Sequence, residues 1–330
     1  MAAEPARGGV DLGGTKIEAV VVDARNEVLG TARRATPTEG GPADVADAIA
    51  DGMREAAESA GLEVGSLRGV GVGSPGIIDE ATGIVSSAGN LPGWDASFPL
   101  GATLASDLGV HVAVGNDVQV ATEAEFHLGA GRSYDSLLGV FWGTGVGGGV
   151  ILKGQPWLGR GGAGEIGHMV VKIDGALCTC GRRGCMEAYA GRAAMEARAR
   201  RRVEKGRHTD LFHLMRERGR TRLTSAIWAH ALERGDEVAI EIVEKAVAAL
   251  GAGIASAVNL LDVPAVIIGG GLGVRFGEPM AARIAQAMQP HLFHADRPPD
   301  VHVAALGDLG GAIGAALLVS RAASKEYISA

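Results

Sequence analysis

The stretch that decides the fold lies near the start of the chain and reads Gly9-Val10-Asp11-Leu12-Gly13-Gly14-Thr15-Lys16-Ile17-Glu18-Ala19-Val20-Val21-Val22-Asp23. The β-branched run after the glycines favours a strand over a helix. A phosphate-binding loop of the Rossmann or Walker type would open a helix at this point. The stretch therefore predicts two strands joined by a glycine turn, a geometry that brings backbone N–H groups close to phosphate oxygens. An ordinary tight hairpin is the alternative.

Two further glycine turns follow apolar strands later in the chain. The strand at 137–142 leads into Gly143-Thr144-Gly145-Val146-Gly147-Gly148-Gly149, and the strand at 265–268 leads into Gly269-Gly270-Gly271. Helices are expected at 43–61, 117–128 and 236–261, the last with Asp236 as its N-cap. Strands that alternate with helices indicate an α/β fold. The two similar hairpins indicate two related halves.

The bulk composition excludes several classes of protein. A chain of 330 residues predicts about two domains. Its net charge of −7 gives no general attraction to nucleic acid. No apolar run is long enough to span a membrane, and the first nine residues lack the apolar core of a signal peptide. We therefore expect a cytoplasmic protein whose partners include neither nucleic acid nor a membrane.

The three cysteines form the sharpest local signal, because all of them lie in Cys178-Thr179-Cys180-Gly181-Arg182-Arg183-Gly184-Cys185. An odd, tightly spaced set does not form a disulfide framework, and in a cytosolic chain it more often binds metal. Zn²⁺ takes four tetrahedral nitrogen or sulfur ligands, and His168 is the nearest imidazole before the cluster. The sequence therefore predicts a closed, structural zinc site of His168, Cys178, Cys180 and Cys185.

Carboxylates at the ends of strands are the candidates for the chemistry. The strand at 110–115 ends in Asn116-Asp117, where an open α/β sheet places its ligands. From spacing alone either residue could instead be only a helix cap. Asp11 follows a strand in the same way and suits Mg²⁺, a cation that prefers oxygen ligands. Glu165 and Glu187 flank the cysteine cluster and could accept hydrogen bonds from sugar hydroxyls or lie solvated at the surface.

The chain resembles the ROK family (repressor, open reading frame, kinase), a branch of the actin-like and hexokinase-like ATPases, from Asp11 to about Leu318. The motifs that carry the resemblance occur in order: the first hairpin, Gly73-Ser74-Pro75-Gly76, Gly89-Asn90-Leu91-Pro92-Gly93-Trp94, Asn116-Asp117, the second hairpin, Gly164-Glu165-Ile166-Gly167-His168, the cysteine cluster with Met186-Glu187, and Ile268-Gly269-Gly270-Gly271. This resemblance implies a two-lobed, ribonuclease H-like fold with a duplicated βββαβα-type core and a zinc-binding loop. It implies a small lobe of residues 1–117 with about 306–330, and a large lobe of 118–305 with the zinc site.

The resemblance also implies a role for each motif. Asp117 would be the catalytic base that takes a proton from the attacking sugar hydroxyl. His168 would share its two ring nitrogens between zinc and sugar. The sugar contacts would be Gly76, Asn90, Asn116, Asp117, Glu165, His168 and Glu187. ATP with Mg²⁺ would be held by Asp11, Gly13, Gly14, Thr15, Lys16, Gly143, Thr144, Gly145, Gly147, Gly269, Gly270 and Gly271.

The implied activity is the ATP-dependent phosphorylation of a hexose at its 6-hydroxyl, with glucose as the leading substrate, by a homodimer or homotetramer. The segment Asn90-Leu91-Pro92-Gly93-Trp94 resembles the glucokinase form of the sugar loop. N-acetylglucosamine and N-acetylmannosamine remain open as substrates, and polyphosphate remains open as a donor. The alternatives of another class are an inactive sugar-binding protein and a sugar-responsive transcriptional regulator without its DNA-binding domain. We expect the enzyme, because the first hairpin begins near residue 9 and Asp117 is intact.

Overall fold

The computed structural model describes residues 5–89, 91–94 and 96–328, and describes side chains as far as residue 321. The chain forms two compact units. The first comprises Met1–Gly129, Leu158–Ala163 and Leu306–Ala330, and the second comprises Ala130–Trp157 and Gly164–Ala305.

The first unit is built on a mixed five-stranded sheet with the order β3-β2-β1-β4-β7. Its strands are β1 (Arg7–Leu12), β2 (Lys16–Val22), β3 (Val28–Ala35), β4 (Val70–Ser74) and β7 (Val112–Asn116). The first three strands are antiparallel, whereas β4 and β7 run parallel to β1. The remaining elements are α1 (Pro42–Ser59), η1 (Val64–Ser66), β5 (Ile77–Asp79), β6 (Ile84–Ser86), α2 (Leu100–Leu108), α3 (Asp117–His127), η4 (Gly307–Leu309) and α10 (Gly310–Ile328). The sheet presents the carboxyl ends of β1, β4 and β7 at one edge.

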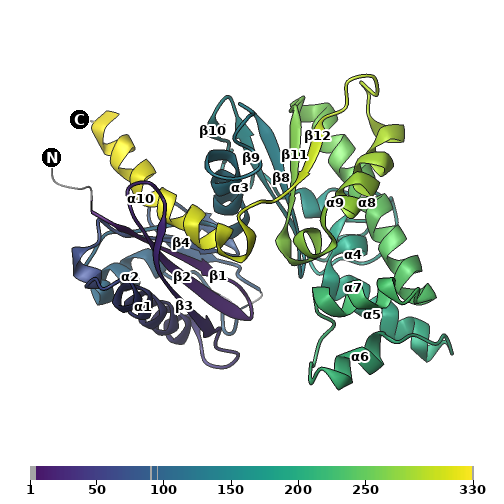
Figure 1. Ribbon diagram of the computed structural model, residues 1–330, viewed down its shortest axis with the longest axis horizontal. Helices are drawn as coiled ribbons and strands as arrows, with labels where there is room; N and C mark the ends of the chain where they lie inside the picture. Colours follow the sequence, from purple (N-terminus) through teal and green to yellow (C-terminus); the bar gives the residue numbers. More distant parts are fainter. Residues whose placement is uncertain (1–4, 90, 95, 329–330) are drawn as a thin grey trace. The chain divides into compact units, whose positions relative to one another are not determined.

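The C-terminal helix α10 packs directly on the sheet of the first unit, where Figure 1 shows it in yellow. It lies against Gly9 and Gly71, which are register partners in β1 and β4. A Cβ atom at either glycine would overlap a backbone carbonyl oxygen of α10, that of Ala312 or Ala315. The missing side chains therefore let the helix backbone approach the sheet closely. Helix α3 also packs on α10, and the first unit accordingly continues past residue 117 to Gly129.

The second unit repeats the same plan, with the sheet order β10-β9-β8-β11-β12. Its strands are β8 (Leu137–Trp142), β9 (Val146–Leu152), β10 (Gln155–Pro156), β11 (Ala265–Gly269) and β12 (Asp300–Val303). The strands β8, β9 and β10 are antiparallel to their neighbours. Strand β11 runs parallel to β8, and β12 runs parallel to β11. Both sheets thus order their strands third, second, first, fourth and fifth along the chain, which is the duplication that the sequence predicts.

Between β10 and β11 the second unit carries a long insertion that holds the cysteine cluster and most of the helices. Its elements are η2 (Ile166–His168), α4 (Glu187–Ala190), α5 (Arg192–Glu204), α6 (Leu211–Glu217), α7 (Ser225–Glu233) and α8 (Glu237–Leu261), followed after β11 by α9 (Gly270–Met288) and η3 (Gln289–His291). Asp236 caps α8 as expected, since its side chain accepts the N–H of Ala239. Buried Trp142 and Trp228 lie in the core that these helices share with the sheet.

Candidate active site and metal centre

The first glycine turn joins β1 to β2 in the first unit, as the sequence predicts. The N–H of Gly13 donates to the carbonyl of Lys16 (2.9 Å), and Thr36 donates its hydroxyl to the carbonyl of Gly13 (2.6 Å). Gly14 and Thr15 at the tip are exposed. The ammonium group of Lys16 lies 3.4 Å from Glu18 and 3.8 Å from Asp308. The turn is thus fixed at its base and open at its tip, with its cation held beside two carboxylates.

Asp117 begins α3 at the carboxyl end of β7, and Asn116 is the cap of that helix. The side-chain oxygen of Asn116 accepts the N–H groups of Val118 and Gln119, both at 3.1 Å. Asp117 also accepts the N–H of Val118, at 2.9 Å. The side-chain amide oxygen of Asn116 is therefore occupied by hydrogen bonds to the helix. The Asp117 carboxylate lies at the helix N-terminus, which favours negative charge.

Asp11 is a strongly perturbed carboxyl group at this edge of the sheet. Burial, followed by the nearby charge of Asp117, raises the pKa of Asp11 to about 7. Lys16 opposes the shift and Glu18 adds to it. A carboxyl group whose charged form is this unfavourable alone is suited to a bound cation, because a cation reverses the balance. The donor chemistry at Asp11 fits Mg²⁺.

Gly76 follows β4 and has a positive φ of 98°. A Cβ atom there would lie 2.6 Å from the carbonyl oxygen of Ser86, so glycine is required both by conformation and by space. Asn90, another of the sugar contacts that the resemblance implies, lies outside the residues that the structure describes.

In the second unit, the second and third glycine turns lie side by side. The hairpin between β8 and β9 is closed by a bond from the N–H of Gly143 to the carbonyl of Gly145 (3.0 Å). Gly270, with φ 76°, begins α9 so close to the end of β8 that a Cβ atom would lie 2.7 Å from the carbonyl oxygen of Trp142. Gly271 in turn faces Ser225: a Cβ atom at Gly271 would lie 3.8 Å from the Ser225 hydroxyl oxygen. The structure thus brings together both glycine motifs that the sequence assigns to the nucleotide in this unit.

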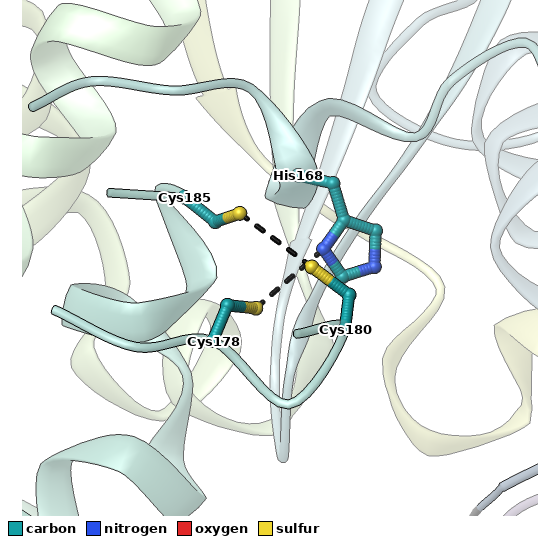
Figure 2. A group of neighbouring side chains, drawn as sticks. All are labelled: His168, Cys178, Cys180 and Cys185. Atoms are coloured by element: carbon teal, nitrogen blue, oxygen red, sulfur yellow. Dashed lines mark hydrogen bonds between the residues drawn. The ribbon is translucent and has the colours of Figure 1, made fainter. Parts of the chain in front are cut away.

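The four expected metal ligands converge in the second unit (Figure 2). Their ligand atoms, one from each of His168, Cys178, Cys180 and Cys185, all lie within 4.8 Å of one another. The Sγ–Nδ1 distance from Cys178 to His168 and the Sγ–Sγ distance from Cys180 to Cys185 are both 3.7 Å. Zinc–sulfur bonds of about 2.3 Å at tetrahedral angles separate neighbouring sulfurs by about 3.8 Å. The cluster therefore has the size and the donor set of a tetrahedral zinc site.

The three thiols differ in pKa: burial raises the pKa of Cys178 and raises that of Cys185 to about 12, whereas the pKa of Cys180 shifts the other way. A hydrogen bond from the backbone of Arg182 lowers the pKa of the Cys180 thiol to about 6. Because the thiolate is the form that binds metal, this favours coordination at neutral pH.

Glu187 and Glu165, the two expected sugar carboxylates of this unit, differ in their surroundings. One Glu187 oxygen accepts the N–H of Val146 (3.0 Å) in the hairpin, and the other accepts the hydroxyl of Thr179 (3.2 Å) in the metal turn. Glu187 thus connects the glycine hairpin to the cysteine cluster. Glu165 is exposed, and its carboxylate lies 3.9 Å from Nε2 of His168. Since His168 directs Nδ1 at the cysteines, its Nε2 faces Glu165 and is free of the metal site.

Arg192 contacts the second glycine hairpin, and the sequence analysis does not single it out. It is the first residue of α5, and its guanidinium donates to the hydroxyl of Thr144 (2.8 Å) and to the carbonyl of Leu223 (2.9 Å). The sequence offered no signal for it, because the contact joins a helix start to a hairpin almost fifty residues earlier.

Two sheets of one strand order, each with a glycine turn between its first two strands, define an actin-like ATPase fold. The model of the ROK family matches residues 7–322, and the chain therefore belongs to the ROK family.

Its relatives include sugar kinases. It is 34% identical over 287 residues to a glucokinase of Thermotoga maritima, which covers 86% of this chain and 88% of that one. It is 32% identical over 315 residues to an N-acetylmannosamine kinase of Haemophilus influenzae, with 94% of each chain covered. Among solved structures, a ROK family glucokinase of Streptomyces griseus in complex with glucose and AMPPNP is similar with a TM-score of 0.83, at 33% identity, and covers 96% of this chain and 99% of that one.

No helix in the described part of the chain is both long and apolar enough to cross a membrane.

Proposed function

We propose that this chain is a hexokinase-type enzyme that transfers the γ-phosphoryl group of ATP to the 6-hydroxyl of a hexose, and that the hexose is glucose. The glucokinase relatives and the similarity to a glucokinase with glucose and an ATP analogue support the proposal. The observation that carries it is a carboxylate, Asp117, at the carboxyl end of β7 in a chain with three glycine turns suited to phosphate.

The reaction assigns Asp117 the role of general base. It accepts the proton of the attacking hydroxyl as the bond from that oxygen to the γ-phosphorus forms and the bond to the β-phosphate oxygen of ATP breaks, which releases ADP. Phosphoryl transfer needs little covalent chemistry from the protein, so that positioning and charge stabilisation account for most of the rate. General-base catalysis contributes about 10²–10⁴-fold.

Mg²⁺ would be held near Asp11, whose raised pKa marks an unfavourable buried charge in the absence of a cation. The ion would neutralise charge on the phosphates of the donor. The backbone N–H groups of the glycine turns and the Thr15 hydroxyl would bind phosphate oxygens, and Lys16 would add its positive charge once it turns from Glu18 and Asp308.

Zinc would be held by His168 and the three cysteines as a closed structural site. Its role would be to fix His168, so that Nε2 is presented to a sugar hydroxyl beside Glu165. Glu187 would be positioned by the same turn through Thr179. The metal thus acts on the sugar through the residues that it orients.

N-acetylmannosamine is the second candidate substrate, and the relative of 32% identity that is named for it motivates its inclusion. The two sugars differ at carbon 2, where glucose has a hydroxyl and the other has an acetamido group. A pocket whose polar groups hydrogen-bond the 2-hydroxyl of glucose disfavours a sugar that lacks this hydroxyl, because those polar groups of the pocket are then left unpaired.

The test is a panel of glucose, mannose, fructose, N-acetylglucosamine and N-acetylmannosamine, with ATP or polyphosphate as donor, reported as kcat/KM. The proposal expects glucose with ATP to give the highest value. A higher value for an N-acetylhexosamine would replace the substrate, and no turnover with any sugar would refute the kinase.

We also propose that the chain forms a homodimer or homotetramer. Exposed apolar side chains such as Leu260 (81% exposed) and Phe293 (82% exposed) in the second unit are consistent with buried contacts between subunits. Light scattering coupled to size-exclusion chromatography measures the mass, and a monomer at micromolar concentration would refute this proposal.

A further inference from the structure

Arg192 lies where three parts of the second unit meet. Its backbone N–H donates to the carbonyl of Gly143 (3.1 Å), and its guanidinium reaches the hydroxyl of Thr144 and the carbonyl of Leu223. Two residues after Leu223, the hydroxyl of Ser225 faces Gly271 at the start of α9. The guanidinium is therefore placed between the second glycine hairpin and the segment that borders the third glycine turn.

The hydrogen bond to Thr144 fixes what the threonine hydroxyl can do. A hydroxyl has one proton to donate and can also accept. Since a guanidinium only donates, the oxygen of Thr144 must accept the bond from Arg192. Its own proton is then left for another acceptor, and Thr144 is exposed at the tip of the hairpin. Arg192 thereby turns Thr144 into a donor directed at a ligand.

Positive charge accumulates at this point without a dedicated counterion. Burial lowers the pKa of Arg192, the charge of Glu196 opposes this shift, and the charge of Arg222 adds a smaller lowering. The Glu196 carboxylate, however, is committed to the N–H of Leu223 (2.8 Å) and to Arg200 (2.6 Å). Within the described residues neither guanidinium forms an ion pair, and guanidinium groups of this kind are suited to bind an anion.

We propose that Arg192, assisted by Arg222, binds and positions the phosphate chain of the phosphoryl donor by orienting the Thr144 hydroxyl and neutralising the chain's charge. The proposal rests on the proposed kinase function and adds a residue on the donor side of it. The ligand chemistry is a chain of phosphoanhydride-linked phosphates. ATP and inorganic polyphosphate both supply such a chain.

Further exposed arginines precede Arg222 in the sequence and bear on the source of the phosphate chain. Arg216, Arg218, Arg220 and Arg222 follow one another at alternate positions, all exposed, and none of them forms an ion pair within the described residues. A triphosphate is short and would engage Arg192 and its neighbour only. An inorganic chain of many phosphates is longer and could in addition engage exposed arginines that precede Arg222.

The experiment compares direct binding and turnover in the wild-type chain, Arg192→Met, Arg192→Lys and Arg222→Met. Binding of ATP, AMP, tripolyphosphate, long-chain polyphosphate and glucose is measured by isothermal titration calorimetry, and KM and kcat are measured for each donor. Arg192→Met keeps the apolar stem of the side chain and removes its charge and its donors. Arg201→Met, at an exposed position of the same helix, is the matched control.

We expect Arg192→Met to weaken ATP binding by about tenfold to a hundredfold, the usual effect of losing a hydrogen bond to a charged group. Binding of AMP and glucose should change less than about twofold, because neither carries a phosphate chain. Arg192→Lys should lie between, since it keeps the charge and loses the fork geometry. Arg201→Met should behave as the wild type.

The remaining outcomes separate the two proposals. If Arg192→Met weakens ATP, AMP and glucose alike, the residue is only structural, and if it weakens none of them, the proposal is wrong. If the wild type binds ATP but phosphorylates no sugar, the kinase function fails, whereas the effect of Arg192 on ATP binding still decides this proposal. Wild-type binding of neither ATP nor polyphosphate overturns both. An Arg222→Met effect confined to long-chain polyphosphate identifies that chain as the source, and an effect on ATP identifies the nucleotide.

Discussion

At the scale of single residues, the chemistry of the first unit depends on two carboxyl groups at the ends of β1 and β7. These two strands run parallel with β4 between them, so that Asp11 and Asp117 lie at the same edge of the sheet. The charge of Asp117 raises the pKa of Asp11. A base and a cation ligand are thus placed at one edge, and the cation that Asp11 would bind also relieves the repulsion.

Replacement of Asp117 tests the base. We expect Asp117→Asn to lower kcat by at least about a hundredfold, because the amide cannot accept the hydroxyl proton. Glucose binding should remain, since the amide keeps the shape of the carboxyl group. Asp47→Asn, at an exposed position of α1, is the control and should leave kcat unchanged. Retention of more than about a tenth of wild-type kcat by Asp117→Asn would contradict the role.

The perturbed pKa of Asp11 makes a prediction about stability in the absence of divalent cations. The folded state holds the proton up to about pH 7, whereas an unfolded Asp releases it near its model value of 3.8. Below about pH 4, Asp11 is protonated in both states and does not lower the free energy of unfolding. As the pH rises from there towards 7, the free energy of unfolding falls, because only the unfolded state releases the proton.

Asp11→Asn removes that penalty. The free energy of unfolding of Asp11→Asn should exceed that of the wild type by a margin that grows by about 2 kcal/mol between pH 5 and pH 8. The measurement is urea denaturation of the zinc-loaded proteins in buffer without Mg²⁺ and without chelator. A gain that is equal at both pH values, as expected for the Asp47→Asn control, would show that Asp11 titrates normally.

At the scale of elements, the close contact of α10 with the sheet depends on glycine in β1 and β4. A Cβ atom at Gly71 would overlap the carbonyl oxygen of Ala315, and backbone cannot move away as a flexible side chain can. The same helix places Gly311 beside the carboxylate of Asp11. A Cβ atom at Gly311 would lie 2.7 Å from Oδ2 of Asp11. The packing of α10 therefore also shapes the surroundings of the candidate magnesium ligand.

Gly71→Ala should consequently lower the free energy of unfolding by about 3 kcal/mol through overpacking. Gly65→Ala is the matched control, since nothing lies within 4 Å of its would-be Cβ. The measurement is urea denaturation of both variants. Equal stability of the two would show that α10 can shift away from the sheet without cost.

At the scale of the whole molecule, the metal cluster organises the long insertion of the second unit. It joins η2, through His168, to the turn that precedes α4, and Glu187 continues the connection from that turn to the glycine hairpin. A structural zinc site contributes its binding free energy to folding. The insertion should therefore depend on metal for its order.

We expect metal analysis to find about one zinc per chain and expect chelation to lower the thermal midpoint of the protein. Cys178→Ser should lose the zinc and unfold at a lower temperature. Re-added zinc should restore the midpoint of the chelated wild type but leave that of Cys178→Ser unchanged. A zinc content near zero in the wild type, purified without chelator, would remove the metal assignment.

The sequence by itself determined the features that depend on local spacing. The β-branched run after the first glycine turn indicates a hairpin from local sequence alone, and the structure has β1 and β2 there. Three cysteines within eight residues are necessarily close in space, so three of the four metal ligands also follow from neighbours in the chain. The Asp236 cap follows for the same reason. Only the tertiary structure decided which residue caps α3, because Asn116 and Asp117 are equally good caps by type.

Contacts between distant segments also had to come from the folded chain. Glu187 bonds to the hairpin through Val146 and Arg192 to Thr144, and nothing in their local sequence marks either contact. The need for glycine in β1 and β4 is evident only from the packing of α10, whose backbone leaves no room for a Cβ atom there. Local rules fix backbone shape over a few residues, whereas a side chain's partner is set by the packing of the whole unit.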